Sequence, residues 1–330
     1  MLKTVFYRKP NSRLPFVLFF LAFVLPCVVF AQRVAETPIR IDTDLVAFDV
    51  TVTDADGRPV RGLEARDFRI FEDNVERPVE FFDVVQKAGE ERPVAVVFAL
   101  DVSGSVTVQE LESMSRAMRI FVERFAGKNA SFAVLTFGMK VNLLQGLTSD
   151  HKKLEKAYRK LLRETDGLST HAYDAVDYAI RLLNREAPRT RGQLPVKKSV
   201  ILVTDGFPVG DIVSPKTVIE RANQSDVSVY SVTTPSFSRW QTGKKPLPTV
   251  LDVSGLIEKT GGKNFYATDT NFEPFFRALA ETVASSYLLA FYPKEEKGRD
   301  GQFRKVRIEI TREGLTLKQN RDGYQFAGGL

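Results

Sequence analysis

The chain has 330 residues, and its 47 Lys and Arg against 41 Asp and Glu give a formal net charge of +6. One cysteine and two histidines argue against a zinc site of the usual ligand types. A chain of this length buries a sufficient hydrophobic core without disulfide bonds.

The first 31 residues have the pattern of a secretory signal peptide. Residues 1–13 carry four basic side chains and no acidic one, and the almost wholly apolar stretch Leu14–Phe30 follows. Val29–Ala31 offers small residues where a signal peptidase reads, which predicts cleavage after Ala31. Removing this leader leaves a net charge of +2, which gives little support to a nucleic-acid surface. We therefore expect export from a bacterial cytoplasm to the periplasm, the cell surface or the exterior.

Two other interpretations of the leader stay open. As an uncleaved membrane anchor, the apolar stretch is near the lower length limit for a span, and Pro26 interrupts it. Cys27 suggests a lipoprotein, but Leu25 and Pro26 match poorly because the residue before a lipidated cysteine is normally small. Contact with a membrane is expected only through an uncleaved anchor.

Both ends of the mature chain predict β structure. Leu45–Thr53 alternates apolar and polar residues in its second half, as a strand with one exposed face does. Phe68–Phe71 and Val79–Val85 are predicted to pair as strands around a turn. Phe303–Thr311 and Leu315–Gln319 predict a second hairpin. We hypothesise that these segments join into one sandwich.

Between residues 91 and 290, strand patterns alternate with helical ones. The predicted strands are Val94–Leu100, Ser131–Phe137, Val141–Gln145, Val200–Thr204, Val227–Thr233 and Phe265–Ala267. The predicted helices are Val106–Phe125, 150–163, 172–186, Pro215–Gln224, Thr249–Thr260 and Glu273–Ser285. This alternation predicts right-handed crossovers and a mostly parallel sheet covered by helices on both faces. The fold class is therefore α/β, with a doubly wound sheet and flanking β-rich terminal segments.

Three polar residues follow the first of these strands at alternate positions. Asp101 ends the apolar run, and Ser103 and Ser105 lie in the turn that opens the next helix. Ligands of open α/β sheets bind outside the carboxyl ends of the strands. A carboxylate and two hydroxyls there suit Mg²⁺, Ca²⁺ or Mn²⁺. The alternative is an ordinary strand-to-helix turn, in which Asp and Ser are common.

Two later positions complete a pattern. Asp205 ends a second apolar strand and precedes a glycine, and Thr170 precedes an amphipathic helix. The order Asp-x-Ser-x-Ser, Thr, strand-terminal Asp-Gly resembles the von Willebrand factor type A domain over about residues 92–290. In that family these pieces form a metal-ion-dependent adhesion site. The resemblance assigns the metal ligands to Asp101, Ser103, Ser105, Thr170 and Asp205. Ser169 replaces Thr170 if the loop register shifts by one.

The resemblance also divides the chain. Residues 1–31 are the signal peptide and 32–90 a β-rich segment. Residues 91–290 are the type A domain with its metal site, and 291–330 a β-hairpin extension. The N-terminal motif "DGRPV.GL...DF...ED" is similar to the segment that precedes the type A domain in a family of secreted bacterial proteins.

The resemblance implies a function and a cofactor. The cofactor is a divalent cation, with Mg²⁺ preferred and Mn²⁺ or Ca²⁺ as alternatives. An Asp or Glu of a partner protein takes the open metal position, so the chain is expected to act in cell adhesion or another protein–protein interaction. One alternative is a periplasmic scaffold or assembly factor with a structural or regulatory metal site. Another is a relic site whose aspartates only cap helices.

A hydrolase is the enzymatic alternative. Ser103 or Ser105 as nucleophile would form a triad with Asp101 and His171, but the G-x-S-x-G elbow is absent. No G-x-x-x-x-G-K-[ST] phosphate loop is present either. We therefore expect no enzymatic activity.

Other residues near the motif have simpler explanations. His171 is expected to be an exposed loop residue, and the helix dipole accounts for Asp174. Asp166 is a candidate for indirect support of the metal. The basic loop Ser236–Pro248, which carries Trp240, has the composition of an interface hot spot.

Overall fold

The computed structural model describes most of the chain after the leader. It covers residues 46–84, 92–104, 106–127, 129–164, 167, 169–191, 194–234, 248–267, 270–293 and 302–325. The predicted signal peptide, Ser105, Asp166 and Trp240 lie outside the described residues. The described residues all belong to the compact unit Ile41–Leu330. Within them, no helix has the length and apolar character needed to span a membrane.

A six-stranded sheet forms the centre of the α/β part, as predicted. Its strands are β5 (Val94–Asp101), β6 (Ala130–Phe137), β7 (Val141–Thr148), β10 (Lys197–Thr204), β11 (Val227–Thr233) and β12 (Asn264–Tyr266). The order is β12-β11-β10-β5-β6-β7, and only β6 and β7 pair antiparallel. The doubly wound, mostly parallel class is therefore confirmed.

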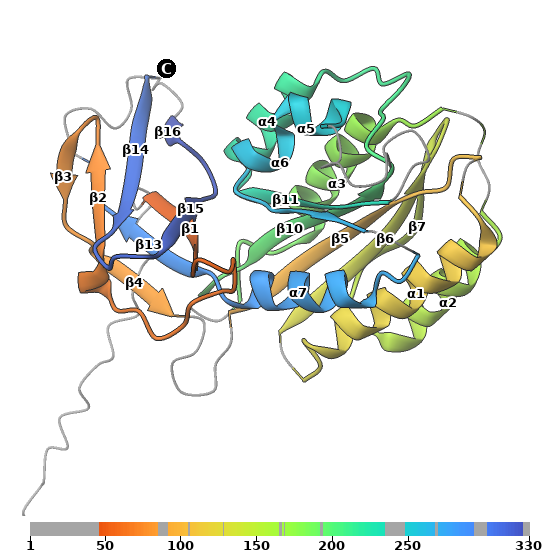
Figure 1. Cartoon of the computed structure of the whole chain (residues 1–330), viewed down its shortest axis with the longest axis horizontal. Helices are drawn as coiled ribbons and strands as arrows, with labels where there is room; N and C mark the ends of the chain where they lie inside the picture. The colour runs from red at the N-terminus through yellow and green to blue at the C-terminus, as the bar shows by residue number, and fades with distance from the viewer. Residues whose placement is uncertain are drawn as a thin grey trace, which may run out of the picture. The chain divides into compact units, whose positions relative to one another are not determined.

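Helices cover both faces of this sheet (Figure 1). α1 (Val108–Glu123), α2 (His151–Leu161) and α7 (Glu273–Ala284) share one buried apolar cluster with the strands. α3 (Ala172–Glu186), α4 (Pro215–Gln224), α5 (Val250–Ser254) and α6 (Leu256–Lys259) share the other. The single helix expected over Thr249–Thr260 is two short helices. Gly255 lies between them with φ of 70°, a left-handed conformation that ends the first helix.

β5 and the first turn of α1, which flank the loop with Ser103, are both firmly positioned. All eight residues of β5 are buried, which explains its continuous apolar sequence. Phe98 in its middle meets Phe121 of α1 edge to face, with centroids 5.4 Å apart. At the start of α1, Thr107 and Glu110 form a capping box, in which each side chain bonds the other's backbone N–H. β5 and the first turn of α1 are therefore both fixed on either side of this short segment.

Strands from both ends of the chain form a β-sandwich. One sheet contains β15 (Thr316–Gln319), β1 (Val46–Thr53), β13 (Tyr287–Phe291) and β4 (Phe81–Val84), in that order. The other contains β16 (Gly323–Gln325), β14 (Phe303–Ile310), β2 (Phe68–Glu72) and β3 (Val75–Arg77). Side chains of both sheets share one buried cluster. The hypothesis that the terminal segments join into one sandwich is confirmed.

Two predicted strand pairings are wrong. The segments expected to form the C-terminal hairpin are β14 and β15, which belong to opposite sheets: β15 pairs with β1 and β14 with β2. Phe68–Phe71 pairs with β3 rather than with Val79–Val85, and β4 pairs with β13 instead. The apolar alternation of each strand predicted its existence, but distant partners decided the pairing.

The sandwich contacts the amino ends of the parallel strands. Arg92, just before β5, pairs with Asp49 of β1, and its Nε donates to the Pro195 carbonyl over 2.8 Å. Lys197, the first residue of β10, donates from Nζ to Ser286 Oγ over 2.7 Å. β5 and β10 are each eight residues long, so these contacts lie at the edge of the sheet opposite to the loops that follow their carboxyl ends.

Candidate metal centre

Asp101 is a buried carboxylate at the carboxyl end of β5. Its side chain accepts the Ser103 backbone N–H on Oδ1 and the Thr204 hydroxyl on Oδ2, both over 2.9 Å. Burial raises the pKa of Asp101 above its usual value, although hydrogen bonds from Ser103 and Thr204 oppose this rise. A cation next to this carboxylate would offset the cost of its burial. The surroundings of Asp101 are therefore compatible with an adjacent metal ion.

Asp205 follows the neighbouring strand β10. Its Oδ1 accepts the Phe207 backbone N–H over 2.9 Å, and its negative charge adds to the raised pKa of Asp101. Gly206 has φ of +85°, and a Cβ there would lie 2.7 Å from the Thr249 Cγ2 atom. The glycine is thus required by both conformation and space. The two aspartates therefore come from adjacent strands of the sheet.

Thr170 lies on the loop before α3 and is buried. It forms an isolated β-bridge with Val209, with N–H···O distances of 3.2 and 2.9 Å. The Ser169 hydroxyl donates to the Val209 carbonyl over 2.7 Å. This bond engages Ser169 in fixing the loop and favours Thr170 as the candidate ligand. The bridge brings the Thr170 loop beside the loop that follows Asp205.

Ser103 is also buried, and its loop meets the Thr170 loop. The Gly104 N–H donates to the Gly167 carbonyl over 2.7 Å. The structure therefore brings together the three loops that carry Asp101 with Ser103, Thr170, and Asp205. Ser105 lies outside the described residues.

The donors are oxygen atoms of carboxylates and hydroxyls. No group of three or more His, Cys, Asp or Glu able to hold a metal occurs in the described part of the chain. A metal site built from two carboxylates and several hydroxyls does not require three residues of these four types. This donor set suits a hard cation such as Mg²⁺.

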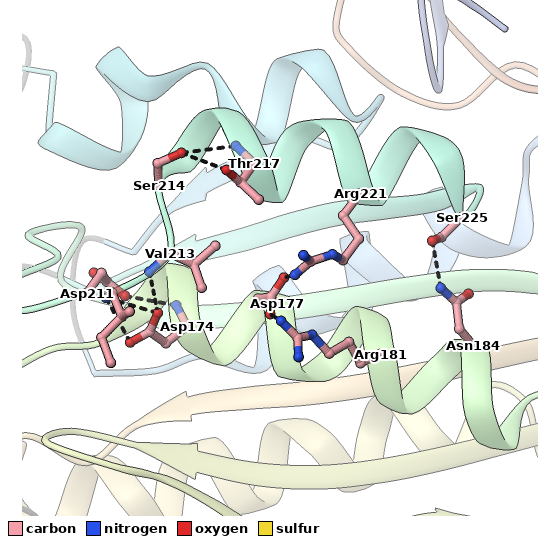
Figure 2. A network of polar contacts seen from close by, with 11 residues as sticks. Asp174, Asp177, Arg181, Asn184, Asp211, Val213, Ser214, Thr217, Arg221 and Ser225 are labelled. Carbon is pink, nitrogen blue, oxygen red and sulfur yellow. Dashed lines mark hydrogen bonds and ion pairs between the residues drawn. The ribbon is translucent and has the colours of Figure 1, made fainter. Parts of the chain in front are cut away.

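The pairing of Asp174 with Asp211 was not predicted. The Asp174 carboxylate accepts the N–H groups of Ile212 and Val213, and Asp211 Oδ1 accepts the Asp174 N–H over 2.8 Å (Figure 2). Burial raises the pKa of Asp211 to about 6. Asp174 therefore fixes the loop after Asp205 to α3, a more specific role than dipole complementarity. The two residues are 37 positions apart, so no local sequence signal links them.

His171 is partly enclosed rather than an exposed loop residue. Its Nδ1 lies 3.4 Å from Asp174 Oδ2, and its side chain is 19% exposed. It therefore supports the same loop junction.

Asp177 joins α3 to α4 in the same network. It is 4% exposed and pairs with Arg181 on its own helix and Arg221 on α4 (Figure 2). We expect Asp177→Ala to lower the free energy of unfolding by about 2 kcal/mol, since two cations lose their partner but Arg181 stays largely exposed. Urea unfolding measures this change. Glu220→Ala, which breaks an exposed pair with Lys216 on α4, is the control and should change it by less than about 0.5 kcal/mol; equal effects would contradict the prediction.

The sequence and the fold were compared with known proteins. The family model of the von Willebrand factor type A domain matches residues 95–277. No curated protein matches the sequence.

Several solved structures are similar to parts of the chain. A von Willebrand factor type A protein from Catenulispora acidiphila is 14% identical, over 79% of this chain and 74% of its own, with a TM-score of 0.47. The vWF domain of the type V pili tip protein Mfa5 from Porphyromonas gingivalis is 14% identical, over 58% and 95%, with a TM-score of 0.44. An aerotolerance-related membrane protein from Bacteroides fragilis is 17% identical, over 58% and 98%, with a TM-score of 0.42.

The family model spans more than half of the 330 residues, and the described strands and helices within it have the doubly wound arrangement. The chain belongs to the von Willebrand factor type A domain family.

Proposed function

We propose that this chain is an exported, non-enzymatic binding module that captures an acidic side chain of a partner protein through a divalent metal ion. The family to which it belongs consists of protein-interaction modules. Asp101, Ser103, Ser105, Thr170 and Asp205 would hold the metal, for which Mg²⁺ is the preferred ion.

The observation that carries the proposal is the environment of Asp101. Asp101 is 2% exposed, feels the negative charge of a second aspartate, Asp205, and bonds only to neutral donors among its described contacts. A buried carboxylate is normally paired with a cation or coordinates a metal. When bound, a divalent cation would supply this charge and keep a coordination position for a carboxylate from outside.

The same contacts argue against a hydrolytic triad. A nucleophilic serine needs a base within hydrogen-bond reach. The His171 Nδ1 atom instead faces Asp174, on the helix that follows. Asp101 accepts from Ser103 and Thr204, and no described contact joins it to His171. We therefore assign the serine-bearing loop to metal binding.

Thermal unfolding of the purified protein with Mg²⁺, Mn²⁺, Ca²⁺ or EDTA tests the metal site. A metal at ten times its Kd stabilises the folded state by about 1.4 kcal/mol, which raises Tm by a few degrees. We expect this rise in the wild type and not in Asp101→Ala or Asp205→Ala.

Asp211→Ala, which removes a carboxylate of the neighbouring loop, is the matched control and should keep the metal response. A wild type whose Tm is unchanged by all three ions at millimolar concentration would contradict metal binding.

A further inference from the structure

Exposed apolar side chains gather on the loops around the candidate metal centre. Of eleven large hydrophobic residues exposed in the described part of the chain, six follow the carboxyl ends of the parallel strands. These six, which we call the apolar rim, are Val108, Met139, Val209, Ile212, Val250 and Val253. Single exposed apolar residues are ordinary on a protein surface, whereas several gathered at one site indicate an interaction surface.

Two rim residues are held by the loop that follows Asp205. Val209 makes both backbone hydrogen bonds of the bridge with Thr170. The Ile212 N–H donates to the Asp174 carboxylate, while its side chain is 90% exposed. These hydrogen bonds fix the backbone at Val209 and Ile212. The exposure of both side chains therefore does not depend on movement of the loop.

Met139 is held over the loop on the other side of the site. It lies in the turn between β6 and β7, and a Cβ at Gly167 would approach its Sδ atom to 2.3 Å. Gly167 in turn accepts a hydrogen bond from Gly104 in the Ser103 loop. The thioether therefore packs beside the metal loop and still exposes half of its surface.

Val250 and Val253 belong to the short helix α5. The Leu251 N–H donates to the Gly206 carbonyl over 3.2 Å, which fixes the helix next to Asp205. Leu251 points into the core, whereas Val250 and Val253, three positions apart, share the exposed face. Val253 is 79% exposed.

The strand order places the rim on both sides of the metal centre. The centre lies between β10 and β5; Met139 follows β6, the next strand beyond β5, and α5 follows β11, the next strand beyond β10. A ligand that fills the centre therefore meets aliphatic side chains in both directions. The contacts of the sandwich lie at the amino ends of the strands, so its described residues leave this surface uncovered.

We propose that the metal centre and the apolar rim together bind an exposed segment of a partner protein in which an Asp or Glu is flanked on both sides by aliphatic or aromatic residues. The proposal rests on the proposed function and specifies the partner. The carboxylate complements the cation, and the flanking side chains bury their apolar surface against the rim.

Selection from a display library of random dodecapeptides tests this proposal. The library is applied to the immobilised full chain in Mg²⁺, and bound clones are released with EDTA. We expect an enriched acidic residue with apolar residues within two positions on both sides. Enrichment of the acid without apolar neighbours would overturn this inference and leave the proposed function standing. A wild type that yields no EDTA-released motif would overturn both.

Variants of the rim provide the second readout. The enriched peptide is synthesised, and its affinity is measured by fluorescence anisotropy. Loss of exposed aliphatic contacts in the double variant Ile212→Ser, Val253→Ser should weaken binding about tenfold, without lowering Tm. Val75→Ser is the control, because Val75 is also an exposed aliphatic residue (52%) but lies on the sandwich, away from the rim. Equal loss in the control, or no loss in the rim variant, would contradict the assignment.

Discussion

Asp49→Ala is expected to lower the free energy of unfolding by about 4 kcal/mol, the range for removing one partner of a buried ion pair. Burial alone would raise the pKa of Asp49, but Arg92, Lys197 and Arg321 outweigh it and hold this pKa below its usual value. The alanine leaves Arg92 and Lys197 buried without their acidic partner. Urea unfolding at pH 7 measures the change.

The backbone of Asp49 makes the substitution a clean test. Its N–H donates to Asn320 Oδ1 over 3.1 Å, and its carbonyl accepts the Asn320 N–H over 2.9 Å. Alanine retains both bonds, so the loss reports the carboxylate alone. Asp73→Ala removes a half-exposed carboxylate elsewhere in the sandwich and should cost about 1 kcal/mol or less. A loss below 1 kcal/mol for Asp49→Ala would show that its ion pair does not stabilise the junction.

Lys197→Met is expected to change how stability depends on pH. Burial lowers the pKa of Lys197 to about 8, from 10.5 for a solvated lysine. Below pH 8 the amine is charged in both the folded and the unfolded state, so the cost of burying this charge is fully present. Between pH 8 and 10.5 the folded protein has lost the proton and the unfolded chain still binds it, so stability rises with pH.

Methionine has a similar length and no charge, so the variant lacks this titration. We expect the free energy of unfolding of the wild type, relative to Lys197→Met, to rise by about 3 kcal/mol between pH 7 and 10.5. The comparison cancels tyrosines that titrate in both proteins. Urea unfolding at pH 7, 8, 9, 10 and 10.5 measures it. A difference independent of pH would mean that the buried amine is uncharged or solvated throughout.

Local patterns in the sequence determined the fold class and most candidate ligands. Val94–Leu100 is apolar throughout because both faces of the strand are covered, and this continuous apolar run is visible without a structure. Asp101, Ser103 and Asp205 were predicted as ligands for the same reason, because each lies at or just after the end of a strand that is evident in the sequence. Gly206 marks the tight turn that accompanies Asp205.

Only the tertiary structure decided the relations between distant segments. β14 and β15 are separated by a short turn, yet they join opposite sheets because β2 and β1 offer their edges. Thr204 of β10 donates to Asp101 of the neighbouring strand β5, and Asp174 of α3 pairs with Asp211 of the loop after β10. Lys197 is an ordinary lysine in the sequence, and its pKa is lowered by its burial in the folded chain, where its Nζ donates to Ser286 and to the Val283 carbonyl. Periodicity reports which face of a segment is buried, whereas pairing, burial of charge and the apolar rim depend on which segments meet.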